Sequence, residues 1–142
     1  MPLIIRIMRI EDYESITTLW LSVPGVGLSA ADSMENIARY LERNPGLSFI
    51  ACGADRLVGA VLCGHDGRRG YIHHLAVDPS YRRQGIGKAL VTMCLQALQA
   101  EGIDKCHLFV FTKNQNAKTF WKEIGWAHRA DLIVMSSYTQ NF

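Results

Sequence analysis

The sequence predicts a domain of the α+β class, in which strands and helices are mixed without a strict β-α-β alternation. Its 142 residues are the length of one domain. Its 49% hydrophobic and 20% charged residues are ordinary for a globular protein with a buried core. Strand-like apolar runs and amphipathic helical stretches follow one another without repeats, linkers or low-complexity segments. We therefore expect a single domain over residues 1–142.

The amino-terminal part of the chain is predicted to contain two helices and three strands. Acidic Glu11 and Asp12 stand where a helix begins, and apolar residues follow them at helical spacing. The second helix is expected to end at Asn44-Pro45-Gly46, because glycine and proline stop helices. The predicted elements are a strand over 3–9, a helix over 11–21, a helix capped by Asp32 or Ser33, and a hairpin over 48–52 and 56–63.

The carboxyl-terminal part is predicted to alternate strands and helices around two motifs. Apolar residues at helical spacing run from Leu90 to Leu98. A second apolar strand is expected at Leu108-Phe109-Val110-Phe111, with a helix after it. The remaining predicted elements are a strand over 71–77 and one or two last strands within 127–138.

The loop between the strand over 71–77 and the following helix has the features of an anion site. A helix start offers unpaired backbone N–H groups and the positive end of the helix dipole. Gly85 and Gly87 lack a Cβ, so a phosphate can approach the backbone closely. Positive charge around the same point comes from Arg82, Arg83 and Lys88. The sequence therefore predicts that this loop binds a pyrophosphate.

Two common nucleotide-binding motifs do not fit this loop. A P-loop requires glycine where Arg82 stands and a hydroxyl where Ala89 stands. A Rossmann fingerprint requires a third glycine where Leu90 stands. The pattern that remains, R-x-x-G-x-G after a strand ending in Leu-Ala-Val, resembles the coenzyme A loop of the GNAT superfamily, the GCN5-related N-acetyltransferases.

A second block strengthens the resemblance. Asn114, Ala117 and the run Phe120–Trp126 resemble the N-x-x-A-x-x-x-(Y)-x-x-x-G-(F) block of that superfamily. Together the two blocks cover residues 57–126. The resemblance implies a central, mostly antiparallel sheet of six to seven strands flanked by about four helices. It also implies an N-acetyltransferase that moves an acetyl group from acetyl-CoA to an amine by direct attack in a ternary complex.

The same resemblance implies the residues that hold the cofactor. Backbone groups of Leu75 and Val77 would pair with the pantetheine arm as if it were another strand. Asn114 would contact that arm near the thiol, and an asparagine at this position is also a natural helix cap. The expected coenzyme A contacts are Leu75, Ala76, Val77, Arg82, Arg83, Gln84, Gly85, Ile86, Gly87, Lys88 and Asn114.

Two adjacent histidines are candidates for accepting the proton of the amine. His73 and His74 are neighbours on one predicted strand, so they are expected to point to opposite faces. Position 73 matches a strand position where some family members carry a histidine base, and imidazole suits this task near neutral pH. His74 as the base, and both histidines as purely structural groups, remain open. Tyr71 is the candidate for a substrate contact.

One departure from the family pattern indicates an alternative function. Trp121 stands where the family carries the tyrosine that protonates the departing thiolate. An indole N–H donates a hydrogen bond but is not an acid in this pH range. A non-catalytic acyl-CoA-binding regulatory module is therefore the alternative to the enzyme.

Composition excludes several other classes. The net charge of +2 is too small to indicate nucleic acid as a partner, and no apolar run reaches the roughly 20 residues of a membrane span. The four cysteines are scattered without a metal-ligand pattern, which indicates small buried residues in a reducing cytoplasm and no metal. We expect an amine-bearing small molecule or a protein amine as the partner. The identity of the acceptor and the presence of a homodimer stay open.

Overall fold

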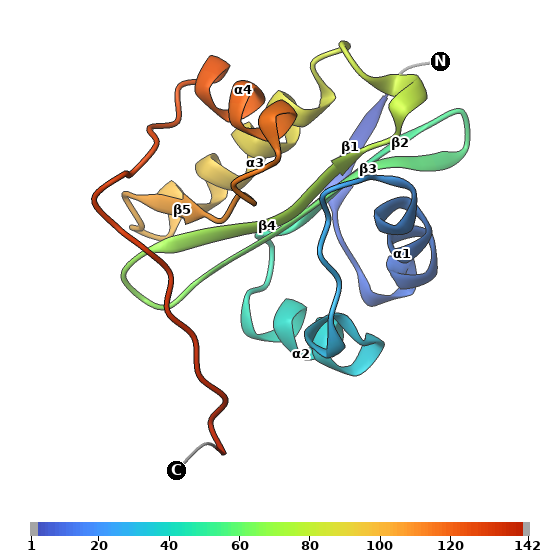
Figure 1. The fold of residues 1–142 in the computed structure, drawn as a ribbon. Helices are drawn as coiled ribbons and strands as arrows, with labels where there is room; N and C mark the ends of the chain where they lie inside the picture. Colours follow the sequence, from blue (N-terminus) through green and yellow to red (C-terminus); the bar gives the residue numbers. More distant parts are fainter. Residues whose placement is uncertain (1–2, 141–142) are drawn as a thin grey trace. The chain divides into compact units, whose positions relative to one another are not determined.

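Residues 3–140 are described in a computed structural model, and they form two compact units (Figure 1). The first unit ends at Phe111, and the second begins at Thr112 and contains the helix α4, Gln115–Glu123. The strands of the first unit are β1 (Ile4–Ile7), β2 (Phe49–Gly53), β3 (Arg56–His65), β4 (Gly70–Val77) and β5 (Cys106–Leu108). Its α-helices are α1 (Tyr13–Ser22), α2 (Met34–Arg43) and α3 (Ile86–Ala100), with 3₁₀ turns at Ile10–Asp12, Ala30–Asp32 and Pro79–Tyr81.

The sheet is mostly antiparallel, as predicted. Its strands lie in the order β1-β2-β3-β4-β5, and only β4 and β5 are parallel. The helices α1 and α2 cover one face of this sheet and α3 covers the other (Figure 1). The described residues thus form a mixed sheet of five strands, fewer than the six to seven expected.

The core lies on both faces of the sheet, under the helices. On the α1 and α2 face, Ile16 and Trp20 are buried against Ile50, Leu62 and Ala76 of the strands. The residues that α3 buries are Ile86, Leu90, Val91, Cys94 and Leu98. Helical spacing in the sequence predicted most of both apolar stripes, but Leu95, which the same spacing placed on the α3 stripe, is 39% exposed.

All four cysteines carry free thiols. Cys63 and Cys94 are fully buried, which confirms the prediction for these two residues, while Cys52 and Cys106 are half-buried. Burial raises the pKa of the Cys106 thiol to about 12. This thiol therefore stays protonated and packs as a small apolar group.

Local sequence explains where α2 begins. Of the two predicted caps, Ser33 is the one used: its hydroxyl accepts the N–H of Asn36 over 3.2 Å. Asp32 instead ends the preceding 3₁₀ turn, so its carboxylate is available for other contacts.

The predicted hairpin turn between β2 and β3 places Ala54 and Asp55 at φ of 51° and 63°, in the left-handed region typical of tight hairpin turns.

Two predictions about the carboxyl-terminal strands are wrong. The strand expected over 108–111 lies earlier, at Cys106–Leu108, because that is where the chain finds its ladder partners on β4; Phe109 and Phe111 are 62% and 63% exposed. Residues 127–138 form no strand, and Ile133 and Met135 are 84% and 86% exposed. An apolar run becomes a strand only beside a hydrogen-bonding neighbour, and the second unit contains none within its described residues.

Candidate functional site

The edge of β4 that faces β5 is open over half its length. β5 pairs with β4 only through Gly70–Ile72, so His73–Val77 have no ladder partner on that side among the described residues. Asp78 N–H donates to the Val58 carbonyl over 2.8 Å. Because hydrogen-bonded and non-hydrogen-bonded pairs alternate in an antiparallel ladder, the backbone groups of Val77 point away from β3, and Leu75 has no partner in the β3 register. These are the residues expected to orient the pantetheine arm.

A β-bulge interrupts β4 at the two histidines. Ala76 pairs with Ala60 but His73 pairs with Leu62, so His74 and Leu75 together oppose one residue of β3. His74 has a φ of 53°, which is unusual for a residue with a side chain. The extra residue resets the alternation, so both histidines project toward the α1 and α2 face. The prediction that they point to opposite faces is therefore wrong.

The chain turns sharply after β4, and Asp78 holds that turn. Its carboxylate accepts the backbone N–H of Ser80 over 2.9 Å and the Ser80 hydroxyl over 2.7 Å. Arg56 adds an ion pair at 2.7 Å. The Ser80 hydrogen bonds and Arg56 lower the pKa of Asp78 to about 2. The carboxylate therefore stays charged at neutral pH and fixes the start of the predicted pyrophosphate loop.

The start of α3 leaves several backbone donors free. Gly85 has a φ of 78° and precedes the helix without a side-chain cap. The first helical hydrogen bond runs from Ala89 N–H to the Gly85 carbonyl over 3.0 Å. The N–H groups of Ile86, Gly87 and Lys88 consequently have no hydrogen-bond partner within residues 3–140.

Basic side chains surround these free donors. Arg82, Arg83 and Lys88 are exposed, as is Gln84. The side chain of Ile86 is buried in the core, so only its backbone is available to a ligand. Free N–H groups at the positive end of a long helix, with cations beside them, suit the charge of a diphosphate.

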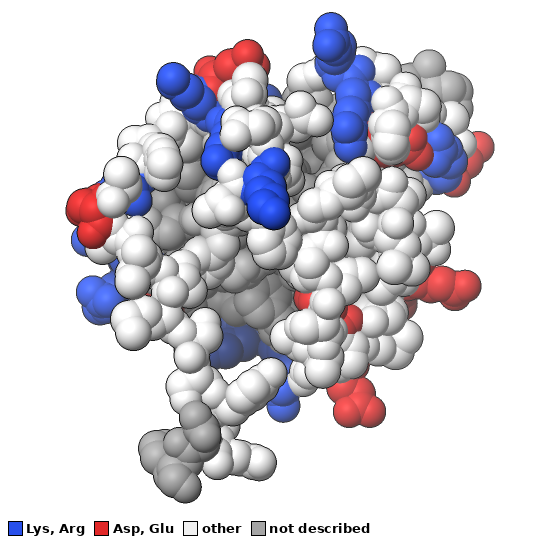
Figure 2. Space-filling view, in the orientation of Figure 1, with Lys and Arg blue, Asp and Glu red and all other residues white. Residues whose placement is uncertain are grey.

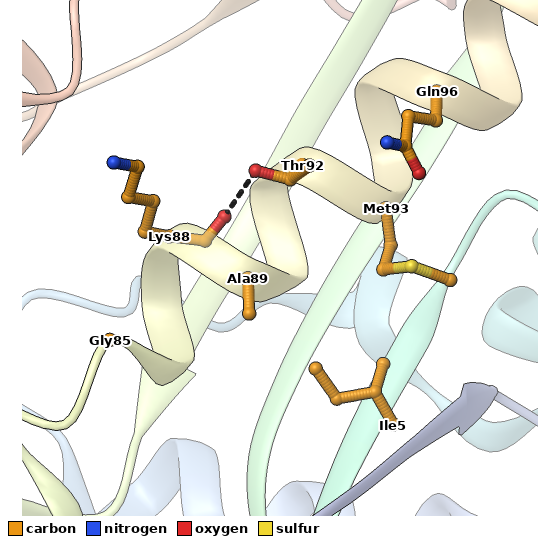
Figure 3. A pocket seen from close by; sticks show the side chains of 7 residues that line it. All are labelled: Ile5, Gly85, Lys88, Ala89, Thr92, Met93 and Gln96. Atoms are coloured by element: carbon orange, nitrogen blue, oxygen red, sulfur yellow. Dashed lines mark hydrogen bonds between the residues drawn. The ribbon is translucent and has the colours of Figure 1, made fainter.

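A groove of about 440 Å³ runs along α3 beside this loop (Figure 3). It is lined by Ile5, Gly85, Lys88, Ala89, Thr92, Met93 and Gln96. The Thr92 hydroxyl donates to the Lys88 carbonyl over 2.9 Å, so it is already used inside the helix. The groove reaches β1, at the opposite edge of the sheet from β5. The groove is therefore separate from the open edge of β4.

A smaller cavity of about 200 Å³ lies beside His73. Among its lining residues are Tyr71 and His73 from β4 and Tyr40 from α2. The rings of Tyr40 and His73 meet edge to face, with centroids 6.3 Å apart. Its remaining lining residues are Arg43, Asn44, Gly64, His65 and Asp66. The cavity thus contains both Tyr71 and His73, and their roles as substrate contact and base stay predictions.

Tyr40 is a residue of this cavity that sequence reasoning missed. It lies three residues after Ile37 on the buried face of α2, and this helical spacing was the available signal. Its hydroxyl is buried without a hydrogen-bond partner in the described part of the chain. Burial raises the pKa of Tyr40 far above its ordinary value, so the hydroxyl remains protonated.

His73 has the properties of a neutral imidazole. Burial lowers its pKa, the neighbouring charge of His74 lowers it further, and Asp32 offsets part of this effect. Neither ring nitrogen of His73 forms a hydrogen bond inside residues 3–140. A neutral imidazole with a free lone pair can accept a proton at neutral pH.

His74, in contrast, has partners for both its side chain and its backbone carbonyl. Its Nε2 lies 2.9 Å from Asp32 Oδ1. Its backbone carbonyl accepts the indole N–H of Trp20 over 3.1 Å, and the two rings meet edge to face at 5.0 Å. Asp32 and Trp20 come from the α1 and α2 region, and no local pattern in the sequence connected them with β4.

The second unit contains the other two predicted site residues. Asn114 caps α4, because its side-chain oxygen accepts the N–H of Ala117 over 3.0 Å. Its expected contact with the pantetheine arm stays a prediction. The Trp121 ring meets Phe120 at 5.1 Å and Trp126 at 4.9 Å, both edge to face. Packing against Phe120 and Trp126 inside the second unit therefore explains the position of the Trp121 ring.

Other kinds of site find little support among the described residues. Figure 2 shows Lys and Arg as separate groups among uncharged side chains, not as one continuous basic surface on this face. Within residues 3–140, no group of three or more His, Cys, Asp or Glu lies close enough to share a metal ion. No helix in the same range combines the length and the hydropathy of a membrane span.

Comparisons with known proteins agree with this geometry. The sequence model of the Acetyltransferase (GNAT) family matches residues 13–126. An acetyltransferase of Sodalis glossinidius is 30% identical over 131 residues, which are 92% of each chain. An acetyltransferase of Pectobacterium atrosepticum is 36% identical over 110 residues, 78% of this chain and 77% of its own. The crystal structure of a NatC complex bound to Gag peptide and CoA is similar with a TM-score of 0.75 and 25% identity, covering 91% of this chain and 87% of that one.

Proposed function

This chain belongs to the GNAT family of acetyltransferases, and on that premise we propose that it acetylates an amine by direct attack within a ternary complex. Acetyl-CoA is the cosubstrate, and it supplies an acetyl group activated as a thioester. We place the reaction in the cytoplasm, where thiols stay reduced. The acceptor in this proposal is a small molecule or a protein that carries an amine.

The observation that carries the proposal is the continuity of two binding surfaces along one stretch of chain. The open edge of β4 ends at Val77, and the free N–H groups at the start of α3 begin at Ile86. The first surface offers backbone donors and acceptors to an amide-containing arm. The second offers donors and positive charge to a diphosphate. Coenzyme A carries both of these groups in the same order.

Orientation is the main contribution expected from the chain. Backbone groups of Leu75 and Val77 would hold the thioester in one position without any particular side chain. Alignment of this kind supplies about 7–11 kcal/mol in well-oriented intramolecular reactions. A weak or distant base is therefore compatible with turnover.

His73 is proposed to take the proton from the amine. It lines the cavity beside the open edge of β4 and is favoured in its neutral form. General base catalysis contributes about 10²–10⁴-fold. Tyr71 and Tyr40, on the same cavity, are proposed to contact the acceptor. The volume of about 200 Å³ suits one side-chain-sized group at the reacting end of the acceptor.

The alternative is a module that binds acyl-CoA without turnover, and Trp121 is the observation that favours it. An indole can donate to the departing sulfur but cannot protonate it in this pH range. In the enzyme, water would supply that proton. The two functions predict the same binding of coenzyme A and differ only in turnover.

An acceptor screen distinguishes them. Free thiol release is followed with acetyl-CoA and a panel of amino acids, polyamines, aminoglycosides and peptides with free amino termini or lysines. The enzyme predicts acceptor-dependent release whose kcat/KM falls about 10²-fold or more in His73→Gln. The binding module predicts a thiol signal at the rate of spontaneous hydrolysis for every amine, together with tight binding of coenzyme A.

A further inference from the structure

The β-bulge of β4 requires a backbone conformation that its own residue disfavours. His74 has a φ of 53°, where a side chain crowds the backbone. Such a conformation persists only when its surroundings hold it. Two contacts do so here: Trp20 donates to the His74 carbonyl over 3.1 Å, and Asp32 Oδ1 lies 2.9 Å from His74 Nε2.

Asp32 connects this bulge to the loop between α1 and α2. Its second carboxylate oxygen accepts the N–H of Ser29 over 3.1 Å, and its backbone carbonyl accepts the Tyr13 hydroxyl over 2.6 Å. Its carboxylate is only 11% exposed, and the His74 side chain 20%. A half-buried imidazole–carboxylate pair therefore joins β4 to the segment that precedes α2.

The contacts separate the roles of the two histidines. His74 Nε2 faces a carboxylate, so this nitrogen carries a proton and acts as a donor. His73 lines the cavity beside Tyr71, and its ring nitrogens have no partner within residues 3–140. The residue after His74 is Leu75, which lies in the part of β4 that β5 does not pair.

We propose that Asp32 and His74 are positioning residues for acetyl transfer: through the His74 imidazole, Asp32 holds the β4 bulge in the geometry that aims Leu75 at the thioester. The pair also ties β4 to the segment 29–32 that precedes α2. This inference rests on the proposed function. It assigns His74 no proton transfer of its own.

A glycine–alanine comparison at position 74 tests the proposal. His74→Ala removes the imidazole but keeps the unfavourable φ, so the bulge should relax and kcat should fall about 30- to 100-fold, as for a small misplacement of reacting groups. His74→Gly also removes the imidazole but tolerates φ of 53°, so kcat should fall less than tenfold. The dissociation constant of coenzyme A should rise by a smaller factor than kcat falls in both, because the pyrophosphate loop is untouched and only the contact at Leu75 is disturbed.

Variants of Asp32 provide the matched rescue. Asp32→Asn keeps an oxygen that accepts from His74 Nε2 and should stay within about threefold of the parent kcat. Asp32→Ala should match His74→Ala, and the double variant should be no worse than either single one. Asp55→Ala is the control, because Asp55 also has positive φ, 63°, but lies in the β2–β3 turn; its kcat should be unchanged.

Hydrogen exchange of the unliganded protein gives a readout independent of turnover. Amides of residues 75–77 and 29–33 should exchange faster in both His74→Ala and Asp32→Ala, and not in Asp55→Ala. Equal losses of kcat in His74→Gly and His74→Ala, with loss of the acidic limb of the pH profile, would make His74 the base and overturn the proposal. Unchanged kcat and exchange in the alanine variants would overturn it as well. Absence of turnover in the parent refutes the proposed function instead, and the exchange measurement still tests the pair.

Discussion

The rings of Tyr71 and His73 stack on one face of β4, with centroids 6.5 Å apart and planes 9° from parallel. Residues two apart on a strand share a face, so this stack follows directly from the strand that precedes the bulge. It forms one wall of the cavity that also contains Tyr40. Burial of His73 in this region lowers the pKa of its imidazole.

Replacing the proposed base should change the rate and its pH dependence together. His73→Gln keeps a polar side chain of similar size but removes the titrating group, so kcat/KM should fall about 10²-fold or more. The acidic limb of kcat/KM, which in the parent should lie below the ordinary imidazole pKa of about 6.5, should disappear. Affinity for coenzyme A serves as the control and should stay constant. An intact acidic limb in His73→Gln would show that another group accepts the proton.

The lowered pKa of His73 should also appear in protein stability. Between its folded pKa and the value of 6.5 for the free side chain, the unfolded chain binds more protons than the folded one. Stability contributed by this group is therefore constant above pH 6.5 and declines as the pH falls from 6.5 through the folded pKa. Urea unfolding at pH 7.5 and 5.5 should show a smaller loss in His73→Phe than in the parent. Identical losses in the two proteins would contradict the desolvation of His73.

The two glycines of the loop should respond to alanine with opposite signs. Gly85 has a φ of 78°, so Gly85→Ala should lower the free energy of unfolding by about 1–2 kcal/mol. Gly87 lies inside the first turn of α3 and is not among the glycines with positive φ. Gly87→Ala should therefore stabilise the helix, by up to about 1 kcal/mol. Chemical denaturation of both variants checks this, and a shift of the same sign in both would contradict the loop conformation.

Much of the fold could be predicted from hydrophobic period alone. Helical spacing gave the buried stripes of α1 and α3, and the hairpin of β2 and β3 followed from alternation around a turn. The bulge at His74 was invisible, because it depends on how β4 pairs with β3 and leaves no mark in the local sequence. The shortened β5 and the absence of a strand over 127–138 were missed for the same reason: the ladder partner decides whether an apolar run becomes a strand.

In the candidate site, too, local features could be predicted from the sequence and contacts between distant residues could not. Glycine and arginine spacing predicted the loop at the start of α3, because its chemistry is local. Tyr40, Trp20 and Asp32 lie far from β4 in the sequence, and only the packing of α1 and α2 against the sheet brings them to His73 and His74.

Introducing at position 121 the tyrosine hydroxyl that the family carries tests whether protonation of the departing thiolate limits turnover. Trp121→Tyr places a phenol where the indole stands. Turnover should rise if protonation of the thiolate limits the rate, and we expect a gain of several-fold. Trp121→Phe is the matched control, since it removes the indole without adding a hydroxyl. Steady-state kcat of the three proteins decides the question, and equal kcat in the Tyr and Phe variants would show that protonation of the thiolate by water does not limit turnover.

Calorimetric titration of coenzyme A into the parent and Gly87→Val tests the central claim most directly. The parent should bind coenzyme A far more tightly than ATP or NAD. The valine side chain should block the approach of the pyrophosphate and raise the dissociation constant at least tenfold, with the fold intact by circular dichroism. Gln96→Ala, on the same helix beyond the loop, should bind like the parent. A folded Gly87→Val that binds coenzyme A as tightly as the parent, or a parent that does not prefer coenzyme A over ATP, would place the cofactor elsewhere.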